Sequence, residues 1–206
     1  KEQLVLMMKA VTLLREGKPA RRADLAPEER GPYSQLGLMT AKPVLYVCNV
    51  EEASAATGNA ISAKVEAMAK AEGARSVVIS AKIEEEIAQM PMADRADFLE
   101  SLGLEEPGLN RLIRTGYELL GLLTFFTVGP KEARAWTVTK GSKGPQAAGV
   151  IHTDFEHGYI RAETIAFDDY VAGKGEAGAR EAGKFRLEGK EYVVADGDVM
   201  HFRFNT

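Results

Sequence analysis

Cysteine is nearly absent from this sequence, whose 206 residues contain only Cys48. A single thiol excludes an internal disulfide bond and a zinc site built from cysteines, and it fits a reducing, cytoplasmic setting. Because Cys48 lies inside a short apolar run, we expect it to be an ordinary core residue.

Long hydrophobic runs are missing as well. No apolar run approaches the ~18–20 residues that span a bilayer, and the sequence shows no signal peptide. The sequence begins with Lys1 rather than methionine, in the middle of a helical pattern, so we expect it to be part of a longer protein.

The chain also lacks an excess of positive charge. It has 26 Lys and Arg against 30 Asp and Glu, a net charge of −4, which argues against a broad nucleic-acid-binding surface. The charge is uneven, since residues 1–42 are net basic whereas residues 43–121 are net acidic. Hydrophobic residues make up 45% of the sequence, enough for the core of one large or two small domains.

What the sequence does contain is a short apolar run at Val44–Cys48, which predicts a β-strand buried on both faces, as in a parallel sheet. The run stops at Asn49, and Glu52 follows three residues later. Ligands of parallel α/β sheets bind just beyond the carboxyl ends of the strands. An amide and a carboxylate at this place suit recognition of a purine edge. The alternative is that Asn49 only ends the strand and Glu52 is solvated.

A second buried strand is predicted at Ser76–Ile79, and it ends in Ser80-Ala81-Lys82. The apolar spacing from Ile61 to Ala69 predicts a helix between the two strands. A right-handed crossover makes such strands parallel, so both strand ends are expected at one edge of the sheet. Ser80 would also serve as the N-cap of the helix that follows.

The rest of the first half is predicted to be helical, with a loop at residues 21–32 that holds at most short helices and in which Gly31-Pro32 interrupts a smoother helix. The predicted helices are Leu4–Leu14, Ile83–Met90, Ala93–Leu102 and Leu109–Leu120.

From Leu122 onward short strands predominate, which predicts an α+β domain with a mixed sheet. The predicted strands are Leu122–Val128, Ala135–Thr139, Tyr159–Phe167, Phe185–Leu187, Glu191–Val194 and Val199–Phe204. We expect one short helix at Ala147–Phe155, and a loop with a single helical turn at the glycine-rich stretch Tyr170–Gly183. Trp136 and Phe202 are expected in the core.

Three long stretches of the sequence are specific enough to compare with known families: PQAAGVIHTDF at residues 145–155, YIRAE at residues 159–163 and DGDVMHFRFN at residues 196–205. They resemble the YchF family, Obg-like ATPases of the translation-factor class of P-loop NTPases. The resemblance covers essentially the whole chain.

The resemblance implies a fold in three parts. Residues 1–42 would be the returning arm of a helical coiled-coil insert, and residues 43–121 the C-terminal part of an α/β P-loop G domain with a parallel sheet. Residues 122–206 would form an α+β, ubiquitin-like β-grasp module, the TGS domain.

In this family the base-recognition motif is Asn-x-x-Glu in place of the guanine-type Asn-Lys-x-Asp. By resemblance, the residues that bind the nucleotide base are Asn49, Val50, Glu52, Ser80, Ala81 and Lys82. An Asn amide matches the neighbouring donor and acceptor of adenine. The carboxylate of Glu52 is one methylene further out than that of the guanine-type Asp, and Val50 replaces the Lys that packs along a guanine. Lys82 would cover the base with its aliphatic stem.

The phosphate-binding half of such a site is missing. The sequence has no Gly-x-x-x-x-Gly-Lys-Ser/Thr and no Asp-x-x-Gly, so nothing in it can hold the β- and γ-phosphates. The resemblance implies an ATPase that binds ATP and Mg²⁺, with GTP as a lesser substrate, through residues outside this chain. We therefore expect no catalytic residue here and no activity from the chain alone.

The expected partner, again by resemblance, is the ribosome or a translation complex, in the cytoplasm. The alternative is a non-catalytic interaction module whose arm and TGS domain bind a ribosomal or protein partner. No membrane and no strong sequence-specific binding of nucleic acid are expected.

Three polar residues of the second half lie close together in the sequence, His152, Asp154 and His157. His152 and Asp154 are two residues apart, and neither a cysteine nor a third ligand clusters with them, so we expect no metal site. A polar helix start is the better interpretation, with Thr153 or Asp154 satisfying backbone N–H groups.

Overall fold

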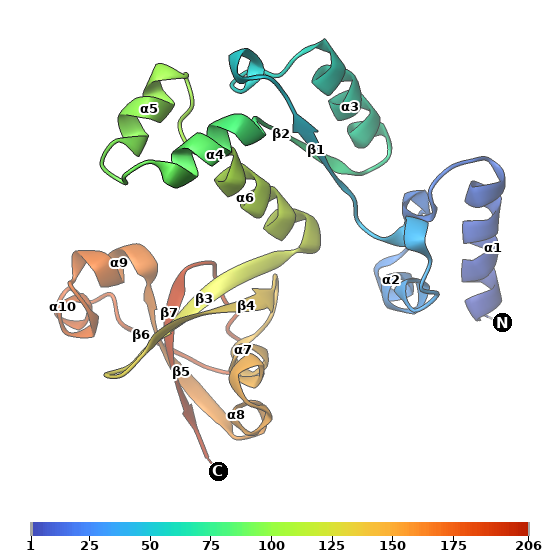
Figure 1. Ribbon diagram of the computed structural model, residues 1–206. Helices are drawn as coiled ribbons and strands as arrows, with labels where there is room; N and C mark the ends of the chain where they lie inside the picture. The colour runs from blue at the N-terminus through green and yellow to red at the C-terminus, as the bar shows by residue number, and fades with distance from the viewer. Residues whose placement is uncertain (1, 206) are drawn as a thin grey trace. The chain divides into compact units, whose positions relative to one another are not determined.

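The computed structural model of the protein describes residues 2–205, which divide into two compact units at Leu119 and Leu120 (Figure 1). Each unit buries its own hydrophobic side chains, in two clusters in the first unit and one in the second, among the described residues. Among the described residues, no helix combines the length and the apolar content that crossing a membrane requires.

The first unit begins with a small helical cluster. Helix α1 (Glu2–Arg15) packs against α2 (Pro27–Ser34) and two short 3₁₀ helices, η1 (Ala20–Arg22) and η2 (Met39–Ala41). The core of the cluster is Leu6, Ala10, Ala20 and Tyr33. The predicted break at Gly31-Pro32 is wrong, because α2 runs through both residues. Pro32 is the sixth of the eight residues of α2, so it removes one backbone hydrogen bond from the second turn without ending the helix.

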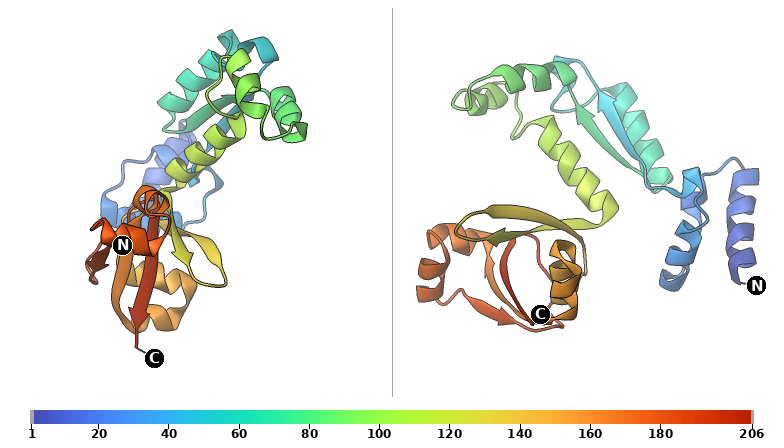
Figure 2. Two further views of the ribbon diagram at one scale, coloured as in Figure 1. Left: turned by 90° about the vertical axis from the view of Figure 1, so that its left-hand side faces the viewer. Right: turned by 60° about the horizontal axis from the view of Figure 1, so that its bottom comes forward.

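A strand–helix–strand unit follows. Strands β1 (Leu45–Asn49) and β2 (Arg75–Ile79) pair in parallel, with Asn49 opposite Ile79, and α3 (Ala60–Ala71) connects them (Figure 2). The predicted parallel pair is thus confirmed. The prediction that the first strand is buried on both faces is wrong, since Val47 is 46% exposed and Cys48 is only half-buried. This sheet has two strands among the described residues, so β1 is an edge strand and is covered incompletely.

Three more helices complete the first unit: α4 (Ala81–Gln89), α5 (Arg95–Ser101) and α6 (Gly108–Leu120). Ile83 and Ile87 of α4 form a core with Leu99 and Leu104. The carboxylate of Glu84 accepts hydrogen bonds from the N–H groups of Gly108, at 2.6 Å, and Leu109, at 3.2 Å. These N–H groups lack partners within α6, so Glu84 fixes the start of α6 against the start of α4.

The second unit is a five-stranded mixed sheet with the order β4-β3-β7-β5-β6. Strands β3 and β7 pair in parallel at its centre, and all other pairs are antiparallel. The strands are β3 (Leu122–Val128), β4 (Ala133–Thr139), β5 (Tyr159–Ala166), β6 (Arg186–Glu188) and β7 (Asp198–Phe204).

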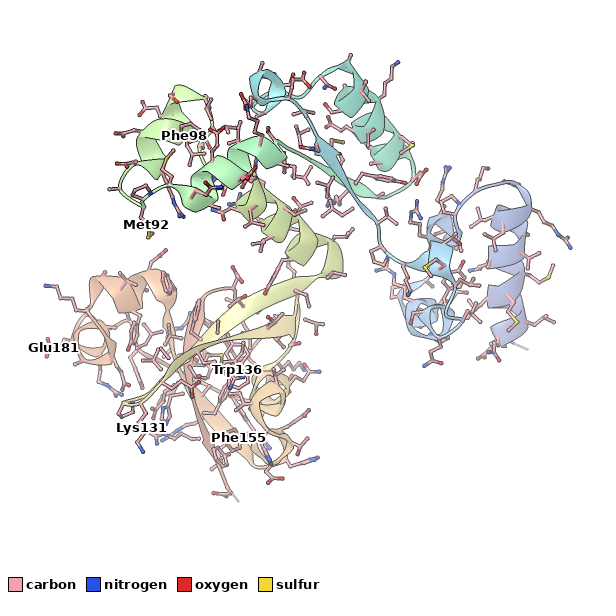
Figure 3. All side chains as sticks on the ribbon, in the orientation of Figure 1. Met92, Phe98, Lys131, Trp136, Phe155 and Glu181 are labelled. Atoms are coloured by element: carbon pink, nitrogen blue, oxygen red, sulfur yellow. The ribbon has the colours of Figure 1, made fainter. Side chains whose placement is uncertain are left out.

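Successive side chains of β3 point to opposite faces of this sheet. Phe125 is fully buried and meets Phe202 edge-on, with ring centroids 5.9 Å apart. Its neighbour Phe126 faces the other way and contacts Phe167, at 5.5 Å. Trp136 and Phe155 pack against the core on the Phe125 side (Figure 3). The expected core positions of Trp136 and Phe202 are therefore confirmed.

Four short helices flank the sheet: α7 (Gly144–Ile151), α8 (Thr153–His157), α9 (Phe167–Ala172) and α10 (Glu176–Glu181). The single helix predicted at Ala147–Phe155 is wrong, because His152 adopts an extended conformation and divides it. The ring nitrogen Nδ1 of His152 accepts a hydrogen bond from the N–H of Asp154 at 3.2 Å. His152, and not Thr153 or Asp154, is therefore the N-cap of α8.

Two further predictions for this unit fail. The stretch Tyr170–Gly183 contains α10 and the end of α9 rather than one helical turn, because Gly173 and Gly178 let the two helices approach closely. A Cβ at Gly173 would lie 2.4 Å from the nitrogen of Ala179. The predicted strand Glu191–Val194 is reduced to one isolated bridge between Val193 and Lys143.

Tyr159, which is buried, and Tyr192, which is partly buried, make the stability of the second unit fall at high pH. Burial, reinforced by the hydrogen bond to Asp198, raises the pKa of Tyr192 to about 12. Burial, with Glu188 nearby, raises the pKa of Tyr159 to about 12. An unfolded tyrosine ionises near pH 10, so these phenols contribute stability that is complete below pH 10 and is lost as the pH rises toward 12.

We expect absorbance at 295 nm to show a late ionisation step near pH 12 in the folded protein. Tyr159→Phe and Tyr192→Phe should each reduce the amplitude of that step. The chain unfolded in guanidinium is the control, in which all six tyrosines should ionise near pH 10. A folded protein that titrates like the unfolded one would contradict the account.

Candidate functional site

The site lies where β1 and β2 end side by side. Because the strands are parallel, the loop after β1 and the start of α4 after β2 meet at the same edge of the sheet. The backbone N–H of Val50 donates to the carbonyl of Ile79 at 2.9 Å, which extends the strand pairing one residue beyond Asn49. Together these segments line an open pocket of about 470 Å³. That volume is within the range of small-molecule sites.

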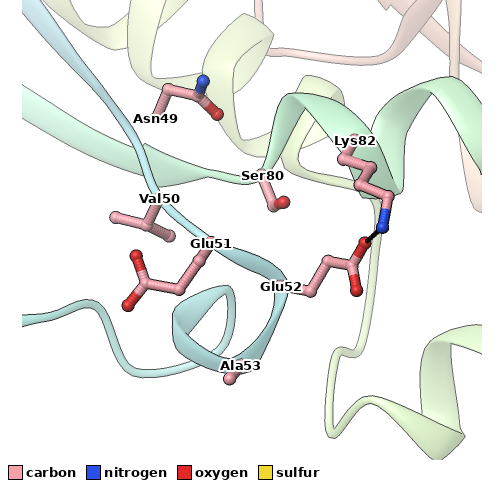
Figure 4. A pocket seen from close by; sticks show the side chains of 7 residues that line it. All are labelled: Asn49, Val50, Glu51, Glu52, Ala53, Ser80 and Lys82. Atoms are coloured by element: carbon pink, nitrogen blue, oxygen red, sulfur yellow. Dashed lines mark ion pairs between the residues drawn. The ribbon is translucent and has the colours of Figure 1, made fainter.

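Five of the six predicted base-binding residues line this pocket, together with Glu51 and Ala53 (Figure 4). The five are Asn49, Val50, Glu52, Ser80 and Lys82. The sixth, Ala81, adjoins the pocket through its N–H, which donates to Oδ1 of Asn49 at 2.9 Å. The structure thus brings the predicted residues together, and their contact with a base stays a prediction.

Glu52 and Lys82 form an ion pair that joins the two loops (Figure 4). The hydrogen bond that Lys82 donates to Glu52, the negative charge of Glu52 and that of Glu86 raise the pKa of Lys82. Both side chains are well exposed. Glu52 is thus paired with Lys82 and still reaches solvent, and its contact with a base stays a prediction.

Ser80 lies at the base of the same pocket. It is 3% exposed, and its Oγ has no hydrogen-bond partner among the described residues. Ser80 does occupy the N-cap position of α4, but its side chain makes no capping bond, so the predicted capping role is wrong. A buried hydroxyl without a partner is costly in a finished structure, and it is a natural place for a ligand contact.

Glu51 was not singled out from the sequence, although it lies inside the four-residue motif. Its carboxylate accepts hydrogen bonds from the hydroxyl of Ser54 and, at 3.2 Å, from Nδ2 of Asn59. These bonds, chiefly that from Ser54, hold the pKa of Glu51 below its usual range. Glu51 therefore fixes the loop after β1 to the start of α3. The capping sequence around Asn59 and Ser62 was a usable signal for this role.

The described residues contain no group of three or more His, Cys, Asp and Glu side chains placed to hold a metal ion. The residues around the pocket offer amide, hydroxyl and backbone groups, one ion pair and the carboxylate of Glu51, which is already bonded to Ser54 and Asn59. Such a set suits the hydrogen-bonding edge of a neutral, planar ligand better than a metal or a phosphate.

The two-part fold is that of an α/β protein of the GTPase type with a C-terminal α+β domain. The structure is similar to the solved structure of a YchF GTPase from Schizosaccharomyces pombe, with a TM-score of 0.82 and 33% identity, over 98% of this chain and 54% of that one.

The chain belongs to the YchF family. Residues 122–205 match the family model YchF-GTPase_C, described as "Protein of unknown function (DUF933)". The sequence is 55% identical over 190 residues to "Ribosome-binding ATPase YchF" of Bacillus subtilis (strain 168), covering 91% of this chain and 52% of the relative. It is 50% identical over 205 residues to the protein of the same name from Pasteurella multocida (strain Pm70), covering 100% of this chain and 56% of the relative. The chain spans about half the length of the curated relatives it matches.

Proposed function

We propose that this chain supplies the base-recognition loops of an ATP-binding, ATP-hydrolysing protein that acts with the ribosome in the cytoplasm. The observation that carries the proposal is the hydrogen bond between Asn49 and Ala81, because it joins the two predicted base loops at one pocket. The names of the relatives, ribosome-binding ATPases, support the enzymatic and ribosomal parts.

The pocket fits an adenine in its chemistry. Asn49 has an amide N–H₂ group to donate, the buried Oγ of Ser80 has no partner, and Lys82 extends an aliphatic stem along the rim. Adenine offers ring acceptors beside an amino donor, and its faces need apolar cover. ATP and Mg²⁺ are thus proposed ligands of the complete protein, with the phosphates and the metal held by residues outside this sequence. Mg²⁺ would neutralise charge that develops on the phosphates.

The proposed parts of the chain keep the expected boundaries, with a coiled-coil arm at residues 1–42, the end of a G domain at 43–121 and a TGS domain at 122–206. The exposed apolar side chains of α1, among them Leu4 at 63% and Met8 at 52%, support a further helix packing on the arm. The strand order with a central parallel pair and helices α7 and α8 on one face supports a β-grasp module.

A second candidate is an interaction module without catalysis of its own. The observation that favours it is the absence of any phosphate-binding loop from these 206 residues. The two candidates are compatible, since the complete protein would hydrolyse ATP while this part reads the base and docks on the partner.

The purified chain alone is expected to show no ATP hydrolysis above background. Phosphoryl transfer depends on groups that position the phosphates and stabilise their charge, and the sequence contains neither a phosphate-binding loop nor a metal-binding Asp-x-x-Gly segment. Steady-state release of phosphate is the measurement, with a full-length YchF protein as the positive control. Turnover that persists through repeated purification would refute this part of the proposal.

Docking on the ribosome is expected to need both the arm and the second unit. Residues 1–42 carry the surplus positive charge of the chain, whereas residues 122–206 are close to neutral. Co-sedimentation with ribosomes should therefore be strong for the full-length protein and weak for residues 122–206 alone or for a protein that lacks them. Equal sedimentation of the isolated unit and the full-length protein would rule out two-part docking. Nanomolar binding of the isolated unit to bare RNA would overturn the charge argument.

A further inference from the structure

The amide of Asn49 is held in one orientation by the backbone N–H of Ala81. That N–H belongs to the first residue of α4, so it has no partner within the helix. Ser80, at the N-cap, does not bond to it, and Oδ1 of Asn49 accepts it at 2.9 Å from 32 residues away. Turning the amide over would place its N–H₂ group against the N–H of Ala81, donor against donor.

The fixed orientation determines what the amide presents to a ligand. Nδ2 is free to donate, and Oδ1 keeps one lone pair beside it, so the outward pattern is a donor next to an acceptor. Adenine N7 and its amino group are the complement of this pattern, an acceptor next to a donor. Guanine shows two neighbouring acceptors, N7 and O6, and O6 would face Oδ1. The N–H groups of Ala81 and Val50, which might otherwise meet O6, are already bonded.

We propose that the N–H of Ala81 is a specificity-determining group, which selects adenine over guanine by preventing the Asn49 amide from turning. This inference rests on the proposed function, because it assumes that the pocket takes a purine base. It assigns base selection to a backbone group, in addition to the side chains of the Asn-x-x-Glu motif. Asn49 is then both a contact of the base and the cap of α4.

Ala81→Pro removes this N–H with little harm to the helix. Proline is favoured at the first position of a helix. The conformation of Ser80, with φ −117° and ψ 107°, is one that a residue before proline adopts. Ala60→Pro is the matched control, because Ala60 is the first residue of α3 and Asn59 before it is also extended. The capping bonds of Asn59 go to Ile61 and Ser62, so this control breaks neither of them.

The experiment titrates the ¹⁵N-labelled chain with AMP and with GMP and follows the amide signals of residues 49–52 and 80–82. The wild-type chain and Ala60→Pro should bind AMP at least about fivefold more tightly than GMP, the discrimination of a well-matched base contact. Ala81→Pro should bring the two affinities within about twofold. If the wild type binds neither nucleotide at these residues, the proposed function and this inference both fail. If the wild type prefers AMP and a folded Ala81→Pro keeps that preference, the inference alone fails.

A second variant keeps the test decisive if Ala81→Pro does not fold. Asn49→Ala removes Oδ1, which accepts the hydrogen bond from the N–H of Ala81. Because the site is exposed, hydrogen exchange of the Ala81 amide should accelerate about tenfold or more. The same variant should lose the preference for AMP. Unchanged exchange at Ala81, or an unchanged preference, would overturn the inference.

Discussion

In a full-length YchF protein that carries this sequence, the double substitution Val50→Lys and Glu52→Asp is expected to shift nucleotide preference toward GTP by about 100-fold or more. The shorter carboxylate can accept the two neighbouring donors of guanine, and each hydrogen bond to a charged group contributes about 1.5–3 kcal/mol. Lysine at position 50 would supply the aliphatic cover that Val50, which is nearly buried, does not.

Competition titrations with ATP and GTP measure this shift. Glu85→Asp is a suitable control, because it makes the same glutamate-to-aspartate change as Glu52→Asp. Glu85 is exposed on α4 and does not line the pocket. The variant must first be shown to be folded, because Val50 is only 9% exposed and a lysine there has to extend to solvent. An unchanged ratio of affinities in a folded double variant would mean that the base is recognised elsewhere.

Asp198→Ala is expected to destabilise the second unit by about 2–4 kcal/mol, since the substitution removes several hydrogen bonds to a charged group. Asp198 is 2% exposed, and its carboxylate accepts bonds from Tyr192 at 2.7 Å, Ala195 at 2.9 Å and Arg186 at 3.1 Å. These bonds fasten the segment before β7 to the sheet. Without them, the hydroxyl of Tyr192 loses its acceptor in a partly buried position.

Chemical denaturation followed by tryptophan fluorescence isolates this effect, because Trp136 is the single tryptophan and lies in the second unit. Asp168→Ala is the matched control, an exposed aspartate in the same unit, and should change stability by less than about 0.5 kcal/mol. If Asp198→Ala were no more destabilising than this control, the carboxylate would not hold the segment in place.

The strand–helix–strand unit could be predicted from the sequence because its signals are local. Two short apolar runs with a helical pattern between them leave few topologies, and the handedness of the crossover then places both strand ends at one edge. The pocket follows from that topology. The hydrogen bond between Asn49 and Ala81 could not be foreseen, because it joins residues 32 positions apart through the detailed geometry of two loops.

In several of the failed predictions, packing against neighbouring segments outweighs the preference of the local sequence. Glycines at 173 and 178 indicated a loop, but they serve the close packing of α9 on α10. The apolar residues of 191–194 suggested a strand, yet they lie in a segment held by the buried carboxylate of Asp198. Cys48 is half-buried because the sheet of β1 has only two strands among the described residues. The residues of β1 alone do not indicate how many strands pair beside it.

The most direct test of the base site is a map of the amide signals of the ¹⁵N-labelled wild-type chain during titration with AMP. The account predicts saturable shifts that concentrate at the side-chain amide of Asn49 and at the backbone of residues 49–52 and 80–82, with much smaller shifts for GMP at equal concentration. Shifts confined to other parts of the chain, or equal responses to AMP and GMP, would contradict the assignment of this pocket to an adenine base.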